Sequence, residues 1–297
     1  YIQLTLNRAN QENSHMKTLE DTCILLSGGA GSLGRKLVEE FFKSEYKVKV
    51  IRILDQNENG LFNLRLRFGD DRIRYFVGNI RDAERVVRAT ENCNIFINCA
   101  ALKDIHFNET NPFEAIESNV IGVQNCIAAA LKNNIDKFIQ VSSDKSVQAT
   151  NTYGRCKSLA ESLTLDANNY KGDKQTRFSV IRPPNFFSSD GSVYNVWAYQ
   201  IENNLPLTLT HPKATRYVMK FEDITSFIVK CVNMMQGGEI FVPSTGVEEI
   251  NLIDEAKKLS SNIRIVGLRK GEKLHELLMD PSEEERAEMV DGIWVVR

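Results

Sequence analysis

The side chains with the clearest chemical use are a tyrosine and a lysine four residues apart. Tyr153 and Lys157 open a helical pattern, and Ser143 precedes them at the end of an apolar run. A phenol has a pKa of about 10, so it acts as a base near neutral pH only where a neighbouring cation stabilises the phenolate. Lys157 would supply that cation. The same spacing recurs at Tyr170 and Lys174, but these lie at a helix end, so the position after Ser143 favours the first pair.

A glycine-rich turn is the second feature that could do chemistry. Gly28, Gly31 and Gly34 lie between a short apolar run at 23–26 and a helical pattern at 32–42. Glycines let the backbone turn tightly and approach a pyrophosphate, and the free N–H groups at the start of a helix favour the same anion. In this strand–turn–helix setting, the loop predicts a dinucleotide-binding site.

An acidic residue follows the glycines at the distance expected of such a site. Asp55 ends the second predicted strand, roughly 20 residues beyond the loop. A carboxylate there accepts hydrogen bonds from the ribose 2′-hydroxyl and repels a 2′-phosphate, which favours NAD over NADP. Nearby Arg52, Arg65 and Arg67 could still be recruited to a phosphate. The residues predicted to hold the cofactor are Gly28, Gly31, Ser32, Leu33, Gly34, Asp55, Asn79, Ile80, Ala100, Ala101, Tyr153 and Lys157.

An alternating pattern of strands and helices must position these residues. Short apolar runs alternate with amphipathic stretches from residue 22 onward, which predicts an α/β fold, a Rossmann-like doubly wound parallel sheet with helices on both faces. The predicted strands are 23–26, 48–54, 73–77, 94–98, 137–141, 178–181 and 239–242. The predicted helices are 32–42, 82–90, 112–132, 153–169, 193–203 and 221–235.

The pattern also divides the chain into regions. Residues 1–16 are polar and aperiodic, and we interpret them as a remnant foreign to the fold. Residues 17–184 are predicted to form the dinucleotide-binding Rossmann domain, to which about 221–243 returns. After residue 184 the alternation stops, so 185–220 and 244–297 are predicted to form a smaller, discontinuous C-terminal substrate domain.

Composition argues against several other classes of protein. The 37 Lys and Arg residues and 39 Asp and Glu residues give a net charge of −2, which offers no basic field for nucleic acid or a membrane surface. The longest apolar stretches are far shorter than the roughly 20 residues of a membrane helix. The six cysteines have no C-x-x-C pair and no metal-ligand spacing with the four histidines. We therefore expect a soluble cytoplasmic protein with buried thiols and no metal site.

Together these motifs resemble a known family. The glycine loop with Ser143, Tyr153 and Lys157 resembles the extended short-chain dehydrogenases/reductases. Residues 100–103 (AALK) and 142–146 (SSDKS) are similar to the inverting UDP-N-acetylglucosamine 4,6-dehydratases (5-epimerases) of acetamido-sugar biosynthesis. Residues 267–276 (GLRKGEKLHE) resemble the nucleotide-binding C-terminal signature of that family. The similarity extends from about residue 22 to about 278.

The resemblance implies a reaction. Tyr153 would take the proton of the sugar 4-hydroxyl while a tightly bound, recycled NAD(P) oxidises C4. Lys145 would remove the C5 proton, and Asp144 would protonate the departing 6-hydroxyl; retaining 4,6-dehydratases are expected to carry Asp-Glu at this pair. Reprotonation on the opposite face would give UDP-2-acetamido-2,6-dideoxy-L-arabino-hex-4-ulose for surface-glycan biosynthesis. The implied catalytic residues are Ser143, Asp144, Lys145, Tyr153 and Lys157.

The resemblance also implies a UDP-sugar site, and the chain is expected to form a homo-oligomer. The implied substrate-binding residues are Lys103, Asn185, Ser192, Arg216, Arg269 and Glu272. The chain departs from the family pattern in several places. Pro183 and Pro184 replace an aromatic–glycine pair, and Asp190 stands where a basic residue is common. Ser143 replaces threonine, and Asp55 occupies the place where many relatives have an NADP-selecting arginine.

Two other functions stay open at this point. A UDP-sugar 4-epimerase of the same fold would need Tyr153 and the cofactor but no C5 base, and the Asp144–Lys145 pair argues against it. A non-catalytic dinucleotide-binding regulator would not need Ser143, Tyr153 and Lys157 together.

Overall fold

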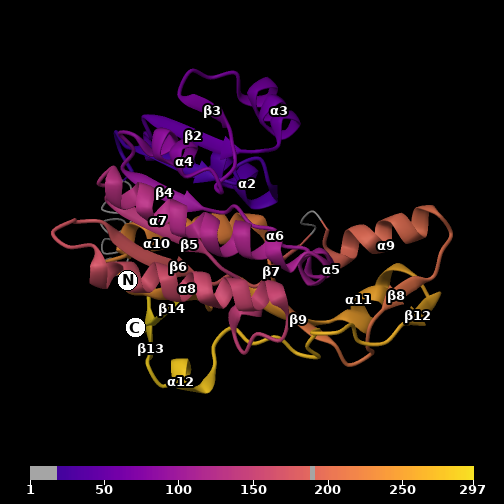
Figure 1. Ribbon diagram of the computed structural model, residues 1–297. Helices are drawn as coiled ribbons and strands as arrows, with labels where there is room; N and C mark the ends of the chain where they lie inside the picture. Colours follow the sequence, from indigo (N-terminus) through magenta and orange to yellow (C-terminus); the bar gives the residue numbers. More distant parts are fainter. Residues whose placement is uncertain (1–18, 188–190) are drawn as a thin grey trace, which may run out of the picture.

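The alternating segments form one large sheet with helices on both faces (Figure 1). The structure is a computed structural model that describes residues 19–187 and 191–297, so the segment 1–16 and Asp190 lie outside the described residues. The nine strands lie in the order β13-β14-β10-β6-β5-β4-β1-β2-β3. In chain order they are β1 (Cys23–Ser27), β2 (Val50–Asp55), β3 (Ile73–Val77), β4 (Ile95–Asn98), β5 (Lys137–Val141), β6 (Arg177–Ile181), β10 (Ile240–Pro243), β13 (Ala287–Val290) and β14 (Ile293–Val296).

Seven of these strands, from β3 to β10, run parallel, and β14 and β13 are antiparallel additions at one edge. The predicted Rossmann-like α/β sheet is therefore confirmed. The two terminal strands differ from the predicted division, because residues 287–296 extend the large sheet instead of joining the smaller domain. Ile293 and Val295 are buried there and cover the edge that β10 would otherwise expose.

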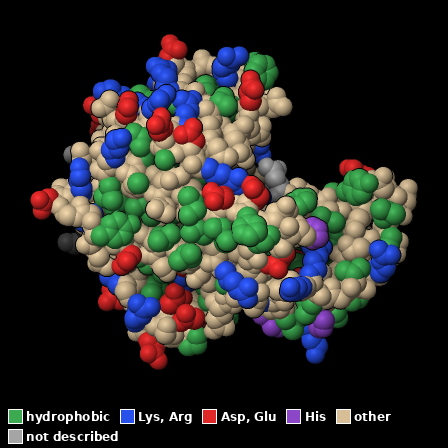
Figure 2. Space-filling view, in the orientation of Figure 1, with side chains coloured by type: hydrophobic (Ala, Val, Ile, Leu, Met, Phe, Trp, Pro, Cys, Tyr) green, Lys and Arg blue, Asp and Glu red, His purple; other side chains and the backbone are tan. Residues whose placement is uncertain are grey.

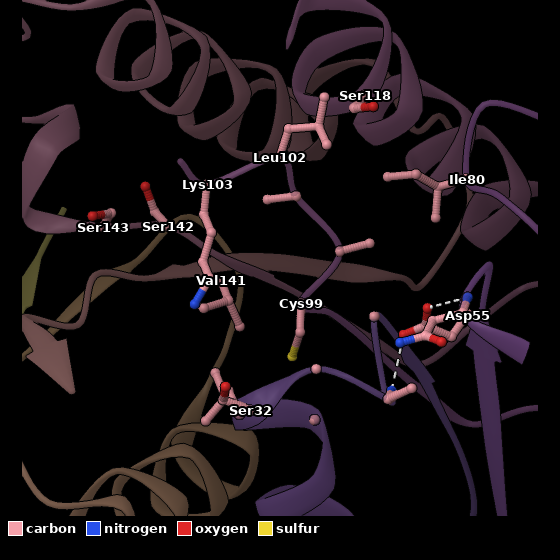
Figure 3. Close-up of a pocket in the computed structure, with 18 of the residues that line it drawn as sticks. Ser32, Asp55, Ile80, Cys99, Leu102, Lys103, Ser118, Val141, Ser142 and Ser143 are labelled. Atoms are coloured by element: carbon pink, nitrogen blue, oxygen red, sulfur yellow. Dashed lines mark hydrogen bonds between the residues drawn. The ribbon is translucent and has the colours of Figure 1, made fainter. Parts of the chain in front are cut away.

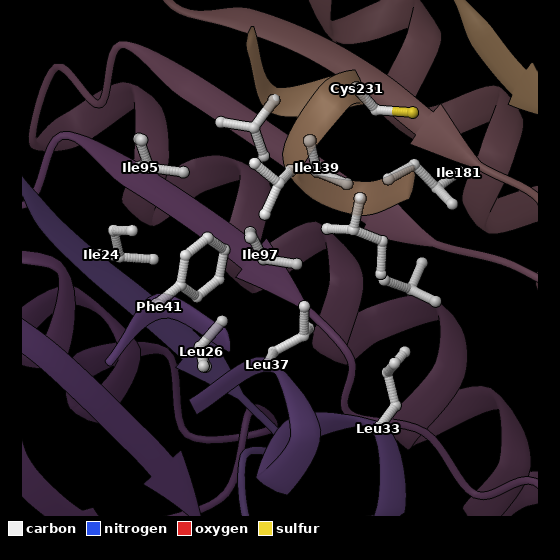
Figure 4. Close-up of a cluster of buried hydrophobic side chains, with 14 of the residues drawn as sticks. Ile24, Leu26, Leu33, Leu37, Phe41, Ile95, Ile97, Ile139, Ile181 and Cys231 are labelled. Carbon is white, nitrogen blue, oxygen red and sulfur yellow. The ribbon is translucent and has the colours of Figure 1, made fainter. Parts of the chain in front are cut away.

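Side chains of successive strand residues point to opposite faces, and each face has its own apolar core. On one face Ile24 and Leu26 of β1 pack with Leu37 of α2 (Ser32–Phe41) and Ile228 of α10 (Phe221–Met234), as Figure 4 shows in part. On the other face Leu25 packs among residues of α4 (Ala83–Thr90), α7 (Gly122–Lys132) and α8 (Thr152–Tyr170). Helices on both sides bury a sheet whose strands read as continuous apolar runs.

Among the helical features that the sequence predictions lack, three lie between β2 and β5 in the chain. A helix α3 (Glu58–Phe68) follows β2, and α5 (Ile105–Thr110) precedes the long helical pattern at 112–132. That pattern is not one helix: α6 (Pro112–Ile116) passes through a π-helical turn at Glu117–Ile121 into α7. An irregular turn inside a helix re-aims a few side chains, and π turns are frequent at functional sites.

A smaller lobe follows β6 in the chain. It contains the three-stranded sheet β11-β9-β7 and the pair β12-β8, with α9 and α11 beside them. Trp197, Leu209 and Ile250 are buried in its own apolar core. Its elements are β7 (Asn185–Phe186), α9 (Val193–Glu202), β8 (Leu207–Leu209), β9 (Thr215–Met219), β11 (Val247–Asn251), α11 (Leu252–Leu259) and β12 (Ile263–Ile265), and a short helix α12 (Pro281–Glu284) leads back to the large sheet. Figure 2 shows a hollow in the surface between the two parts of the molecule.

Candidate active site

A cavity of about 400 Å³ lies at the carboxyl ends of the parallel strands. It lies where β2 and β4 flank β1, so the connections that follow β1 and β4 leave the sheet on opposite sides, and ligands of open α/β sheets bind at such points. Of the predicted cofactor and catalytic residues, Asp144 and Lys145 do not line it, and the others all do. Lys103 and Asn185 of the predicted substrate set line it too, and Figure 3 shows Lys103 extending toward it.

The glycine loop lies too close to its neighbours for any side chain. A Cβ on Gly28 would lie 2.7 Å from the Cα of Ala100, and Gly28 has a φ of 67°. A Cβ on Gly34 would lie 2.4 Å from the carbonyl oxygen of Gly28. The first turn of α2 contains no acidic residue, and no side chain caps it at Gly31. A helix start with neither a side-chain cap nor an acidic residue favours an anion such as a pyrophosphate, as a dinucleotide requires.

Asp55, at the end of β2, fixes the glycine loop through a hydrogen bond to its backbone. Its Oδ2 accepts a hydrogen bond from the backbone N–H of Ala30 at 2.9 Å, and its Oδ1 accepts one from the N–H of Asn57 at 2.9 Å (Figure 3). The cavity reaches this carboxylate, so a ribose hydroxyl placed there would meet it. An arginine that sequence reasoning missed, Arg35 on α2, lines the cavity too.

The three arginines considered as possible phosphate ligands contact other groups. Arg52 donates to the carbonyl oxygens of Ala89 at 2.9 Å and Glu91 at 2.7 Å. Arg67 pairs with Glu39 at 2.8 Å, and Arg65 lies over the ring of Phe62. None of the three lines the cavity.

Tyr153 and Lys157 point into the site from the first turns of α8, and both are buried. Burial raises the pKa of Tyr153; the neighbouring Ser143 side chain acts against that rise, and the charge of Asp144 adds to it. Burial lowers the pKa of Lys157 to about 8, and the charge of Glu161 opposes that fall. The Lys157 Nζ donates to the carbonyl oxygen of Val141 at 2.5 Å, which ties the lysine to the end of β5.

Asp144 and Lys145 are not an exposed ion pair. They lie in a short 3₁₀ turn, Asp144–Ser146, where Asp144 is fully buried and the side chain of Lys145 is 14% exposed. The Lys145 Nζ donates to Asp144 Oδ1 at 2.9 Å and to Asn185 Oδ1 at 2.9 Å. The Asn185 amide donates to Asp144 Oδ2 at 3.1 Å, and the Ser143 hydroxyl donates to Asp144 Oδ1 at 2.9 Å. The structure thus joins the carboxyl group of Asp144, the amine of Lys145 and the amide of Asn185, and two of their group, Ser143 and Asn185, line the cavity.

The π-helical turn holds part of the cavity wall through Asn119. The Asn119 Oδ1 accepts from the N–H of Leu102 at 2.8 Å, and its amide donates to the carbonyl of Leu102 at 2.8 Å. Asn108, which sequence reasoning missed, accepts from Asn119 at 3.2 Å and donates to Leu102 at 3.1 Å. These bonds fix the loop that carries Ala101 and Lys103.

The remaining substrate positions lie in the smaller lobe, outside the cavity. Arg216 of β9 pairs with Glu272 at 3.0 Å, and the other Glu272 oxygen accepts from the backbone N–H of Arg269 at 3.1 Å. Ser192 precedes α9 without capping it through its side chain. The loop at 267–276 reaches the start of α8, because the carbonyl of Gly271 accepts from the amide of Asn151, the N-cap residue of that helix, at 3.0 Å.

This fold and site define a Rossmann-fold enzyme of the extended short-chain dehydrogenase/reductase type. The chain belongs to the polysaccharide biosynthesis protein family, whose model matches residues 24–297. It is 39% identical over 288 residues to an uncharacterized membrane protein of Methanocaldococcus jannaschii, covering 93% of this chain and 86% of that relative. It is 36% identical over 263 residues to a UDP-N-acetylglucosamine 4,6-dehydratase (inverting) of Campylobacter jejuni, covering 88% and 78%.

A solved structure and further relatives are also similar to this chain. Pen from Bacillus thuringiensis matches with a TM-score of 0.88 and 32% identity, covering 94% of this chain and 88% of that one. UDP-glucose 4-epimerases of Rickettsia species are also similar, for example at 30% identity over 274 residues in Rickettsia rickettsii, covering 90% of this chain and 80% of that relative. Within residues 19–187 and 191–297, no helix has the length and apolar character needed to cross a membrane.

Proposed function

We propose that this chain is a UDP-N-acetylglucosamine 4,6-dehydratase that inverts C5. The observation that carries the proposal is the buried cluster of Asp144, Lys145 and Asn185 beside the cavity that Tyr153 lines. Oxidation at C4 needs only a tyrosine, a lysine and a cofactor. Loss of water across C5 and C6 also needs a base and an acid, and the cluster contains one candidate for each.

The glycine loop, Asp55 and Lys157 would hold a nicotinamide dinucleotide, with Asp55 favouring NAD. When bound, the cofactor would accept a hydride from C4 of the sugar and return it to C6 after water has left. The loop fits such a group because its glycines allow a tight turn into α2, and the first turn of that helix contains no acidic residue.

Tyr153 would take the proton of the 4-hydroxyl. Burial alone opposes its ionisation, because it raises the pKa of the phenol. The Ser143 hydroxyl and the Lys157 cation favour the phenolate, so this pair of neighbours is what makes the tyrosine a usable base.

Lys145 would remove the C5 proton, which the 4-ketone has made acidic. For this the amine must be neutral, while Asp144 must be protonated to give its proton to the departing 6-oxygen. Transfer of a single proton along the 2.9 Å hydrogen bond from Lys145 to Asp144 produces both forms at once. A second proton delivered to the opposite face of C5 completes the inversion.

The buried cluster is also what favours a dehydratase over a 4-epimerase. An epimerase returns the hydride to C4 and never removes the C5 proton, so an amine and an acid held together beside the sugar would have no task.

The UDP end of the substrate would lie toward Arg216, Arg269 and Glu272, since a guanidinium pairs well with a diphosphate.

The test is incubation of the protein with UDP-N-acetylglucosamine in deuterium oxide, followed by mass spectrometry and NMR. We expect loss of water, deuterium at C5 and the L-arabino configuration of the 4-keto product, with no need for stoichiometric added cofactor. An isomer of unchanged mass would indicate the epimerase, and no reaction would indicate the regulator. A product that keeps the D-configuration would contradict inversion.

A further inference from the structure

A second set of buried charges extends from the active-site helix to the C-terminal segment. Arg182, at the end of β6, lies between Glu161 of α8 and Glu283 of α12, with closest N–O distances of 2.7 Å to each carboxylate. The side chain of Arg182 is only 2% exposed. Its remaining donor reaches the carbonyl of Leu278 at 3.0 Å, so every N–H of the guanidinium has an acceptor.

This set of charges is bonded directly to the proposed catalytic turn. Glu161 Oε1 lies 2.7 Å from the hydroxyl of Ser146, the last residue of the Asp144–Ser146 turn. The same hydroxyl lies 2.7 Å from the carbonyl oxygen of Ser143. A carboxylate fixed by a bidentate arginine therefore holds the segment that carries Asp144 and Lys145.

The same carboxylate acts on Lys157. Tyr153, Lys157 and Glu161 are spaced four residues apart, so they share one face of α8. Glu161 lies one turn after Lys157 on this face, and its charge opposes the fall in the pKa of Lys157 that burial causes. The other titratable groups acting on Lys157 are the thiols of Cys99 and Cys156, whereas Glu161 is the group with the larger effect.

We propose that Glu161 is a positioning residue for the dehydration. It holds the Asp144–Ser146 turn through Ser146 and supplies the counter-charge of Lys157, while Arg182 and Glu283 hold Glu161 in place. This inference rests on the proposed function of the Asp144–Lys145 pair.

Three variants separate the two effects of Glu161 from general stability. Ser146→Ala removes the contact with the turn and keeps the charge, so kcat should fall about tenfold with KM within about twofold and the pH profile unmoved. Glu161→Gln removes both effects. Its kcat should fall further. The alkaline limb of the pH profile, where kcat falls as pH rises, should also move to lower pH, because Lys157 without its counter-charge loses its proton more readily. Glu283→Gln is the matched control, since it removes a carboxylate from the same arginine but contacts neither Ser146 nor Lys157.

The expected control result is a lower melting temperature for Glu283→Gln with an unmoved alkaline limb. The inference is overturned if Glu161→Gln keeps the wild-type kcat and pH profile, or if Glu283→Gln moves the limb equally. Should Glu161→Gln fail to fold by circular dichroism, Glu161→Asp replaces it. Glu161→Asp keeps the negative charge, but its shorter side chain moves the carboxylate away from Ser146. Its kcat should therefore fall while the alkaline limb of the pH profile stays in place. A wild-type kcat in both Glu161→Asp and Ser146→Ala overturns the inference.

Failure of the proposed function gives a different result. If wild-type protein releases no water from UDP-N-acetylglucosamine, the proposed function falls whatever the variants do. The effect of Glu161 on Lys157 is then measured through NAD affinity against pH, by calorimetric titration of wild type and Glu161→Gln. A loss of NAD affinity that begins at lower pH in the variant supports the inference, and superimposable profiles overturn it.

Discussion

At the scale of single residues, burial decides what Asp144 and Lys145 can do. Adjacent residues of opposite charge on a surface loop would form a solvated pair worth little. Here the acid is fully buried, and the lysine shares the Asn185 amide with it. Both groups are therefore held at fixed positions beside the cavity, as groups that transfer protons to and from a substrate must be.

The first prediction uses two substitutions of Lys145. Lys145→Ala should lower kcat for water loss by about 10²–10⁴-fold, the usual contribution of a proton-transfer group, with cofactor and UDP-sugar affinity near normal. Lys145→Arg keeps a cation for the ion pair with Asp144, but a guanidinium does not give up its proton. It should therefore be as inactive as the alanine variant in a mass-spectrometric assay. If Lys145→Arg works at the wild-type rate, Lys145 supports the pair only structurally and is not the C5 base.

The second prediction concerns cofactor choice at Asp55. Asp55→Arg should weaken NAD binding by about tenfold to a hundredfold and improve NADP binding, because the acceptor of the 2′-hydroxyl is replaced by a partner for a 2′-phosphate. Calorimetric titration with both cofactors measures this. Asp55→Asn is the control, which should lose discrimination without gaining affinity for NADP. A wild-type protein that already prefers NADP, held through Arg35, would contradict the prediction.

At the scale of elements, α8 and the Asp144–Ser146 turn form one working unit. The helix supplies Tyr153 and Lys157, and the turn lies against its first residues. A Cβ on Gly154 would lie 2.2 Å from the carbonyl oxygen of Lys145, so only glycine allows this approach. The sequence pattern predicts the helix but not this contact, because spacing along one element carries no information about the close approach of another.

The third prediction tests that contact. Gly154→Ala should destabilise the protein by about 1–3 kcal/mol, the usual cost of inserting a methyl group into a packed site, despite the higher helix propensity of alanine. It should also lower kcat, since the turn must move away from the helix. Urea unfolding and steady-state kinetics measure the two effects. Ser162→Ala, at an exposed position of the same helix, should change neither, and equal behaviour of the two variants would show that the approach is not tight.

At the scale of the whole molecule, the sequence predicts the features that depend on local patterns, above all the alternation of strands and helices. The glycine loop, Asp55 and the run of parallel strands follow from local patterns, so the fold was confirmed and the predicted cofactor positions lie together at one cavity. The pairing of β13 and β14 with β10 depends on a contact between distant segments. The Glu161–Arg182–Glu283 set has the same origin, since its members lie on three elements far apart in the sequence. A π turn within 112–132 was also beyond the pattern, because its apolar spacing is close to that of an ordinary helix.

The fourth prediction concerns the pH dependence of the whole protein. The pKa of Lys157 is about 8 in the folded state and about 10.4 when unfolded, so between these values the unfolded chain binds more protons and this lysine's contribution to stability rises with pH. The thiol of Cys99 acts in the opposite sense. Burial raises the pKa of Cys99 to about 12, so the unfolded chain loses that proton first, and stability falls as pH rises above about 8.5. The trend of the wild type alone therefore does not isolate the lysine.

Comparison with Lys157→Met does isolate it. The methionine has similar bulk and no charge, so below pH 8 the variant should be the more stable protein by a few kcal/mol, the scale of a shift of about 2 pKa units. That advantage should shrink as pH rises toward about 10, where the wild-type lysine is neutral in the folded state. Activity should change in the reverse direction, because wild-type kcat should fall as pH rises through about 8 and the Lys157 cation is lost. Urea unfolding at matched pH values measures the difference in stability. A difference that does not change between pH 7 and pH 10 would mean that Lys157 keeps its proton throughout, and the alkaline limb of activity would then need another group.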